Sequence, residues 1–94
     1  MLKLYRFQVG YGRSGNLNGI FVEDEERVKK AIGNHVYFGE VLGKHSEVYL
    51  DLEEAHFKEL TDDQPFIHQF EKLDLATGYN PFDFMDEEEE QEDE

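Results

Sequence analysis

Residues 35–52 constrain the fold most, because they contain two runs of strand-forming residues separated by a glycine. Residues 36–42 and 48–52 are mainly β-branched, aromatic or aliphatic, which suits a pleated and half-buried surface. Gly43 and Lys44 lie between the two runs, and a two-residue loop that begins with glycine matches a type II′ turn. The sequence therefore predicts a β-hairpin around which the rest of the chain is arranged.

Turn chemistry and hydrophobic pattern favour different registers for this hairpin. The two-residue turn places Leu42 opposite His45, and Glu40 opposite Glu47. A three-residue loop would instead gather most apolar residues of the hairpin on one face, and these are Val36, Phe38, Leu42, Val48, Leu50 and Leu52. Because a slip of one residue moves every side chain to the other face, the two registers bury different residues. We expect the two-residue turn.

The segments before the hairpin have the patterns of two strands and a helix. Residues 2–9 alternate so that one face is apolar, and residues 17–22 form a second strand after a glycine-rich loop. Residues 23–32 predict a short helix, because acids crowd its first turn and Lys29 and Lys30 lie in its last.

The segments after the hairpin are less regular. Residues 53–60 fit neither the strand period nor the helix period, so an irregular strand and a turn of helix stay open as alternatives. Residues 63–72 predict a second helix, with Thr61, Asp62 and Asp63 as N-cap candidates and Pro65 in the first turn. The aromatic residues of 79–84 have no period, and they either cover their own domain or contact a partner.

These elements predict a single α+β domain over residues 1–85. We expect a mainly antiparallel sheet, the order strand, strand, helix, strand, strand, helix, and two short helices on one face. A chain of 94 residues buries only about two-thirds of the surface that its unfolded form exposes. Exposed strand edges in so small a domain favour homo-oligomerisation. Residues 86–94, of which eight are acidic, predict a disordered tail.

The net charge of −14 is distributed unevenly along the chain. Residues 1–22 hold three bases and no acid, whereas residues 46–94 hold eighteen acids against Lys58 and Lys72. Such a chain repels nucleic acid, because nucleic-acid binding needs basic grooves. The charged partner that it suits is the basic surface of another protein.

Catalysis, cofactors and metals find no support in the sequence. The chain has no cysteine, its four histidines match no metal-binding spacing, and its serines lack a nucleophile motif. We therefore predict no enzyme activity, no cofactor and no metal. The first residues lack the apolar core of a signal peptide and no stretch is long enough to span a bilayer, so we expect a cytoplasmic protein without membrane contact.

Two sets of residues are candidates for binding. Glycine-rich loops can present backbone N–H groups to anions, so residues 10–16 and the predicted hairpin tip form a candidate site for an anionic ligand, although an ordinary hairpin loop has the same pattern. This ligand-binding set is Arg13, Ser14, Asn16, Lys44 and His45. The partner-binding set combines acids with the late aromatics, and consists of Asp51, Glu53, Glu54, Asp62, Asp63, Tyr79, Phe82 and Phe84.

In size, acidity and lack of cysteine the chain resembles the small acidic accessory products of bacteriophages, some of which mimic nucleic acid to blunt host defence. The resemblance implies a non-catalytic inhibitor that occupies a basic, nucleic-acid-binding site on a partner protein. Some phage counter-defence proteins sequester ligands, so a second hypothesis is an oligomer that binds a small anionic, nucleotide-like molecule. A third hypothesis is a structural subunit whose residues 79–84 dock into a neighbour.

Overall fold

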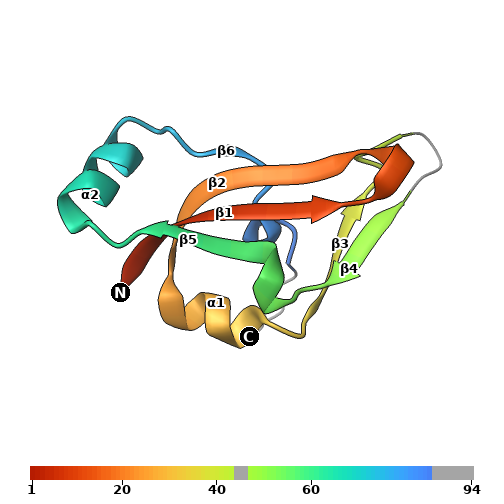
Figure 1. Cartoon of the computed structure of the whole chain (residues 1–94), viewed down its shortest axis with the longest axis horizontal. Coiled ribbons are helices and arrows are strands. Elements are labelled where there is room, and N and C mark those ends of the chain that lie inside the picture. Colours follow the sequence, from red (N-terminus) through yellow and green to blue (C-terminus); the bar gives the residue numbers. More distant parts are fainter. Residues whose placement is uncertain (44–46, 86–94) are drawn as a thin grey trace, which may run out of the picture.

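Strands β1 and β2 form the centre of the fold (Figure 1). They belong to a four-stranded antiparallel sheet in the order β5-β1-β2-β6, while β3 and β4 form a separate two-stranded sheet. The structure is a computed structural model that describes residues 1–43 and 47–85. Its elements are β1 (Leu2–Gly10), η1 (Gly12–Ser14), β2 (Asn16–Asp24), α1 (Glu25–Ala31), β3 (His35–Gly39), β4 (Val48–Asp51), η2 (Glu54–His56), β5 (Phe57–Thr61), α2 (Gln64–Lys72), β6 (Thr77–Gly78) and η3 (Pro81–Asp83). The predicted α+β class with a mainly antiparallel sheet is confirmed.

The β1–β2 hairpin, rather than residues 35–52, is the element to which the others attach. Its register is unbroken from the pair Leu2 and Asp24 to the pair Gly10 and Asn16. The alternation of apolar residues in both strands explains this regularity, because it allows both strands to bury the same face. The strands β5 and β6 then pair along its two outer edges.

The β3–β4 hairpin does not adopt the register that the two-residue turn requires. Tyr37 lies opposite Tyr49, and β3 ends at Gly39 while β4 begins only at Val48. The register shifts by one residue between Tyr37 and Gly39, so only the last pair agrees with the expected turn. The reason is burial, since this register turns four strongly buried apolar side chains toward the large core, namely Val36, Phe38, Val48 and Leu52.

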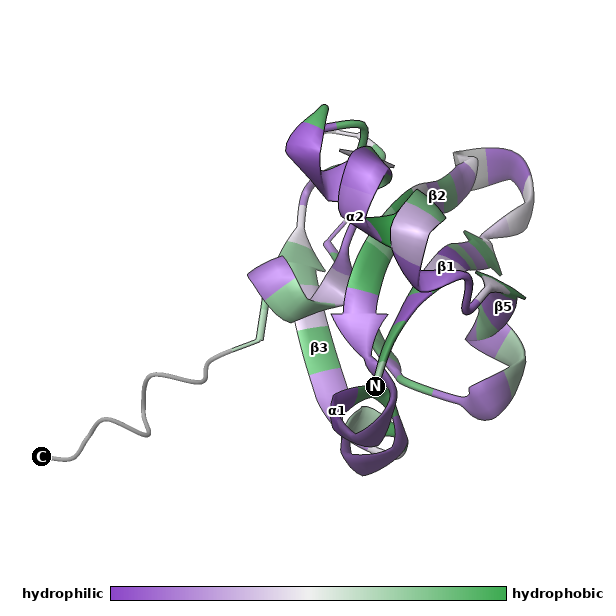
Figure 2. Cartoon of the chain, turned by 90° about the vertical axis from the view of Figure 1, so that its left-hand side faces the viewer, coloured by the Kyte–Doolittle hydropathy of each residue, from purple (hydrophilic) through white to green (hydrophobic). Residues whose placement is uncertain are grey.

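The two helices pack on opposite faces of the four-stranded sheet, which corrects the expectation of one shared face. Val28 and Ala31 of α1 belong to the large core with Tyr5. Ile67 and Phe70 of α2 instead pack against Leu4, the neighbour of Tyr5 in β1. Figures 1 and 2 show the two helices well apart, and Figure 2 shows that most of α1 is hydrophilic.

Local sequence signals set the ends of both helices. The Asp24 carboxylate accepts a hydrogen bond of 3.0 Å from the backbone N–H of Glu26, so Asp24 is the N-cap of α1. Asp63, one of the three N-cap candidates, is the N-cap of α2. Residues 53–60 combine the two alternatives left open for them, because the 3-10 turn η2 leads directly into β5. No helix within the described part of the chain is long and apolar enough to cross a membrane.

Candidate functional site

One face of the four-stranded sheet is covered only at one end. Side chains alternate along β1, so Tyr5 and Phe7 enter the large core while Arg6 and Gln8 point to the opposite face. On this second face α2 covers the end at Leu4. Arg6 and Gln8, both exposed, lie on the part of this face that is left open.

A groove of about 390 Å³ occupies this open part of the sheet, a volume in the range that holds a small molecule. Its polar side chains are a guanidinium, two amides and a hydroxyl, and among the described residues that line it none is acidic. The lining residues are Arg6, Gln8, Asn18, Gly19, Ile20, Thr77 and Gly78. These groups are donors that suit a ligand with anionic or carbonyl oxygens.

Two glycines bring the backbones at the edge of the groove together. Gly19 of β2 lies opposite Gly78 of β6, and the Tyr79 N–H donates a hydrogen bond of 2.8 Å to the Asn18 carbonyl. A Cβ on Gly19 would collide with the Tyr79 backbone, and a Cβ on Gly78 would collide with the Asn18 carbonyl. Gly78 also has a φ of +78°, which side-chain-bearing residues rarely adopt. The short strand β6 can therefore form one wall of the groove only with these glycines.

The groove face carries two cations side by side. Arg6 on β1 lies opposite Lys58 on β5, and paired residues of adjacent strands point to the same face. Within residues 1–43 and 47–85, neither side chain forms an ion pair or a side-chain hydrogen bond. Like charges directly opposite each other destabilise a sheet. An anion in the groove would remove this repulsion.

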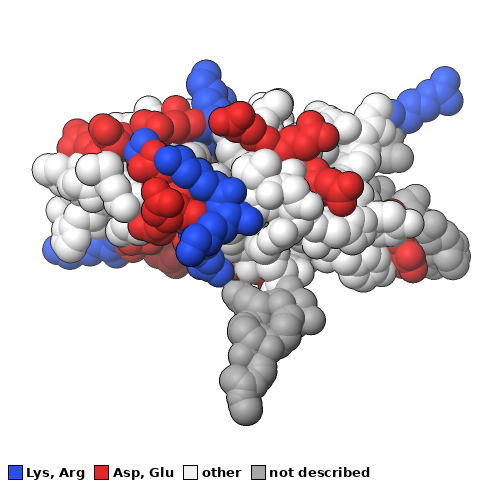
Figure 3. Space-filling model, turned by 90° about the horizontal axis from the view of Figure 1, so that it is seen from below, with Lys and Arg blue, Asp and Glu red and all other residues white. Residues whose placement is uncertain are grey.

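The cations on the other side of the molecule are arranged differently. Arg27 of α1 forms an ion pair with Glu23 at 3.1 Å, and Lys29 lies 3.8 Å from Glu25. Figure 3, which views the molecule from the α1 side, shows basic and acidic side chains intermixed there. The α1 side therefore neutralises much of its own charge, whereas the groove face does not.

Lys3 shows how a cation of β1 behaves on the core side of the sheet. Its ammonium group donates hydrogen bonds to Glu59 at 2.9 Å and to Glu25 at 3.1 Å. These two bonds, with Glu59 the larger effect, raise the pKa of Lys3 well above its ordinary value. The bond from Lys3 lowers the pKa of Glu25. Arg6 has no such carboxylate partner among the described residues.

The predicted ligand-binding residues only partly coincide with this groove. Asn16 lies on the groove face of β2, two residues from Asn18, and Arg13 lies exposed in η1 at the tip of the β1–β2 hairpin. The Ser14 side chain, Lys44 and His45 lie outside the described residues. Leu42, which precedes the predicted hairpin tip, approaches the glycine-rich loop, because a Cβ on Gly15 would lie 3.6 Å from the Leu42 side chain.

The strand residues of the groove were not among the residues predicted from the sequence, and these are Arg6, Gln8, Asn18 and Thr77. The signal for Arg6 and Gln8 was present, because they form the polar half of the alternation in β1. That half remains open because α2 covers only the end of this face at Leu4, and local sequence does not show where a helix packs.

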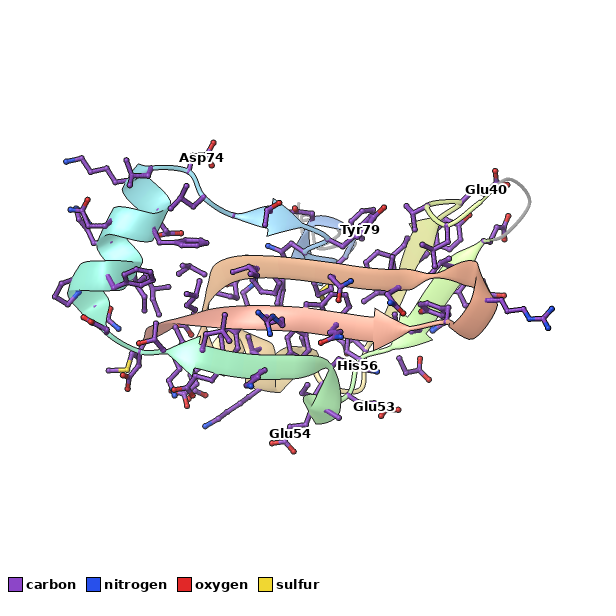
Figure 4. The ribbon with its side chains drawn as sticks, turned by 45° about the horizontal axis from the view of Figure 1, so that its top comes forward. Glu40, Glu53, Glu54, His56, Asp74 and Tyr79 are labelled. Carbon is purple, nitrogen blue, oxygen red and sulfur yellow. The ribbon has the colours of Figure 1, made fainter. Side chains whose placement is uncertain are left out.

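The acids of the predicted partner-binding set are spread over the molecule. Asp51 lies on β4 and accepts a hydrogen bond of 2.9 Å from His35, while Asp62 and Asp63 precede α2. Figure 4 shows Glu53 and Glu54 with His56 at the start of β5. The described acids of this set therefore form no single continuous surface.

The aromatics of that set fold back onto their own domain. Phe82 is 5% exposed and its ring lies 6.3 Å from that of Phe21, so its assignment as a partner contact is wrong. Phe84 lies with its ring 4.7 Å from Phe38, and Tyr79 packs partly buried against the large core (Figure 4). The alternative in which residues 79–84 cover the domain is confirmed.

Metal-binding chemistry has no geometric basis in the described part of the chain, where no three His, Asp or Glu residues are placed to hold an ion.

Comparisons with known proteins add no assignment, since no family model, curated protein or solved structure matches the chain significantly.

Proposed function

We propose that this protein binds a small anionic, nucleotide-like ligand in the groove on the open face of its four-stranded sheet. The observation that carries the proposal is the pair Arg6 and Lys58, two adjacent cations without a carboxylate partner among the described residues of a chain whose net charge is −14. Arg6 supplies charge and a planar set of donors, which suits phosphate oxygens. Gln8, Asn18 and Thr77 supply neutral hydrogen bonds.

The position of these groups on strands supports binding rather than catalysis. Sites on rigid elements hold their geometry better than sites on loops. The groove is open, and among its described lining residues there is no acid, histidine or nucleophile adjacent to a base. We therefore propose a protein that sequesters its ligand unchanged.

Isothermal titration of the full chain with pyrophosphate and with ADP tests this function. We expect binding, and we expect Arg6→Gln to weaken it about tenfold or more, because a hydrogen bond to a charged group contributes roughly 1.5–3 kcal/mol. Lys30→Gln is the matched control, since it removes one positive charge from α1 on the opposite side of the sheet. Equal losses in both variants, or no binding of either probe at millimolar concentration, would contradict the proposal.

The overall charge supports a second candidate function, an acidic inhibitor that occupies a basic surface on a partner protein. Residues 46–94 carry eighteen acids against two lysines. Deletion of residues 86–94 separates the two candidates. Groove binding of pyrophosphate should be unchanged by the deletion, whereas binding to a basic partner should weaken and lose part of its salt dependence.

Self-association and a cytoplasmic location complete the proposal. Among the described residues the sheet of β3 and β4 has two strands, so each has one edge that another copy could extend. Native mass spectrometry of gently purified full chain should show an oligomer with extra mass of a few hundred daltons per ligand, an order of magnitude set by the groove volume. A monomer without added mass would count against ligand sequestration.

A further inference from the structure

The outer face of the β3–β4 hairpin carries side chains that neither core uses. Tyr37 lies opposite Tyr49, and His35 lies opposite Asp51. All four side chains are exposed, because their neighbours along the strands take the inward positions. This face differs from the groove in position and in chemistry. It belongs to the other sheet, and it contains aromatic rings and carboxylates rather than cations and amides.

The rings on this face lie next to one another. The His35 and Tyr49 ring centroids are 5.3 Å apart, and those of Tyr37 and Tyr49 are 6.0 Å apart. Tyr37 remains 51% exposed and Tyr49 52% exposed, so much of each ring is left in water. Tyrosine is enriched at the energetic centres of protein interfaces, because it brings a large rigid surface with a polar end.

Carboxylates surround these rings. Asp51 lies 2.9 Å from His35 Nδ1 at one end of the face. At the other end, Glu47 and Glu40 contribute to a raised pKa of the Tyr37 hydroxyl, after the larger effect of partial desolvation. The strands β3 and β4 themselves contain no Lys or Arg.

We infer that this face, defined by His35, Tyr37, Tyr49 and Asp51 with Glu47 at its edge, docks a basic segment of a partner protein. An Arg or Lys side chain of that segment lies against the Tyr37 and Tyr49 rings, where the ring faces attract a cation. Its charge is balanced by Glu47 or Asp51. The inference is independent of the groove and adds a second binding surface to the protein.

Charge complementarity selects this occupant over the others. A nucleic acid or an anionic lipid surface would bring more negative charge toward the carboxylates, which is unfavourable. A second copy of the chain placed face to face would bring Asp51 and Glu47 toward their own counterparts. A cationic peptide segment can form cation–π contacts with the rings and ion pairs with the carboxylates.

NMR titration of the full chain with a short peptide that contains two arginines in a glycine and serine background tests the inference. We expect the ring signals of Tyr37 and Tyr49 to shift, and a peptide with glutamine in place of arginine to leave them unchanged. These ring signals report the hairpin face itself, so a peptide that binds elsewhere on this acidic chain does not move them.

Four variants complete the experiment. Tyr49→Thr keeps a strand-forming residue and should weaken binding about two- to fivefold, the range for an exposed cation–π contact. Tyr49→Phe keeps the ring and should bind as the wild type does. Glu47→Gln should weaken binding, whereas Glu71→Gln, which removes an exposed acid from α2, should not.

Three outcomes would overturn the inference. The first is an absence of ring shifts at millimolar arginine peptide, and the second is equal weakening by Glu47→Gln and Glu71→Gln. The third is unchanged binding in a folded Tyr49→Thr variant, with folding checked by its amide spectrum. Arg6→Gln should leave peptide binding intact and Tyr49→Thr should leave pyrophosphate binding intact, so failure at one surface is distinguishable from failure at the other.

Discussion

Arg6 lies directly opposite Lys58 in the antiparallel pair of β1 and β5, on the sheet face that α2 leaves open. The arrangement costs stability, because like charges at opposite positions repel. Three residues earlier along β1, and therefore on the opposite face of the sheet, Lys3 contacts both Glu25 and Glu59. The two faces of the same strand thus differ, because one cation has a pair of carboxylates and the other lies opposite a second cation. This contrast distinguishes a structural lysine from a candidate binding arginine.

Replacement of Lys58 by threonine should stabilise the protein in the absence of an anion. Relief of the repulsion should raise the free energy of unfolding by about 0.2–1 kcal/mol. The gain should shrink in 1 M salt, where the screening length is about 3 Å. Urea denaturation at low and high salt measures both effects.

Lys30→Gln is the control for that experiment, because it also makes the chain more negative but removes no repulsion between opposed cations. It should not stabilise the protein. If Lys58→Thr and Lys30→Gln change the free energy of unfolding equally, the Arg6 and Lys58 pair carries no special cost.

Gly19→Ala should disrupt the wall of the groove. Its Cβ would meet the Tyr79 backbone, which cannot rotate away, and such overpacking costs roughly 1–3 kcal/mol. Gly10→Ala is the matched control in β1, where the nearest atom to a Cβ is the Asn16 side-chain oxygen at 3.3 Å. Thermal or urea unfolding should separate the two variants clearly. Comparable stability would mean that β2 and β6 are less tightly apposed than the structure shows.

The elements whose signals are local were predictable from sequence. Asp24 and Asp63 cap helices through their own side chains, so α1 and α2 begin within two residues of their predicted starts. The prediction of the β3–β4 register was wrong, because turn chemistry at Gly43 and burial of Val36 and Phe38 favour different registers. The structure adopts the register that buries Val36 and Phe38.

The groove could not be predicted from local sequence patterns. The alternation of β1 shows that Arg6 and Gln8 share a face, but not that α2 stops short of them. The strand β6 has two residues, and its pairing depends on close approach of Gly19 and Gly78, which are 59 positions apart in the sequence. Asn16, which was predicted as a ligand-binding residue from the glycine-rich loop before it, lies on the groove face of β2, and its role in binding stays a prediction.

The ion pairs of Lys3 predict a specific pH dependence. The folded-state pKa of Glu25 is lowered, first by the hydrogen bond from Lys3, so the stability that this bond contributes is present above the ordinary value of 4.5 and is lost as the pH falls through the folded pKa. Lys3→Gln should therefore lower the free energy of unfolding at pH 6 more than at pH 3. The difference between wild type and variant matters here, because acid also relieves the repulsion among the many other carboxylates. If the difference in unfolding free energy between wild type and Lys3→Gln stays constant from pH 6 to pH 3, the link to the lowered pKa of Glu25 is contradicted.

Phe82→Ala should destabilise the domain far more than Phe84→Ala. Phe82 is 5% exposed, lies edge-on to Phe21 and has the Arg27 guanidinium 4.9 Å from its ring centre, so its removal creates a cavity that costs about 3–5 kcal/mol. Phe84 is 36% exposed, and its loss removes mainly the contact with Phe38. Urea denaturation of both variants measures the loss of unfolding free energy in each. Equal and small effects would mean that residues 79–84 do not cover the core in solution, and the third hypothesis, in which they dock into a neighbouring subunit, would then regain support.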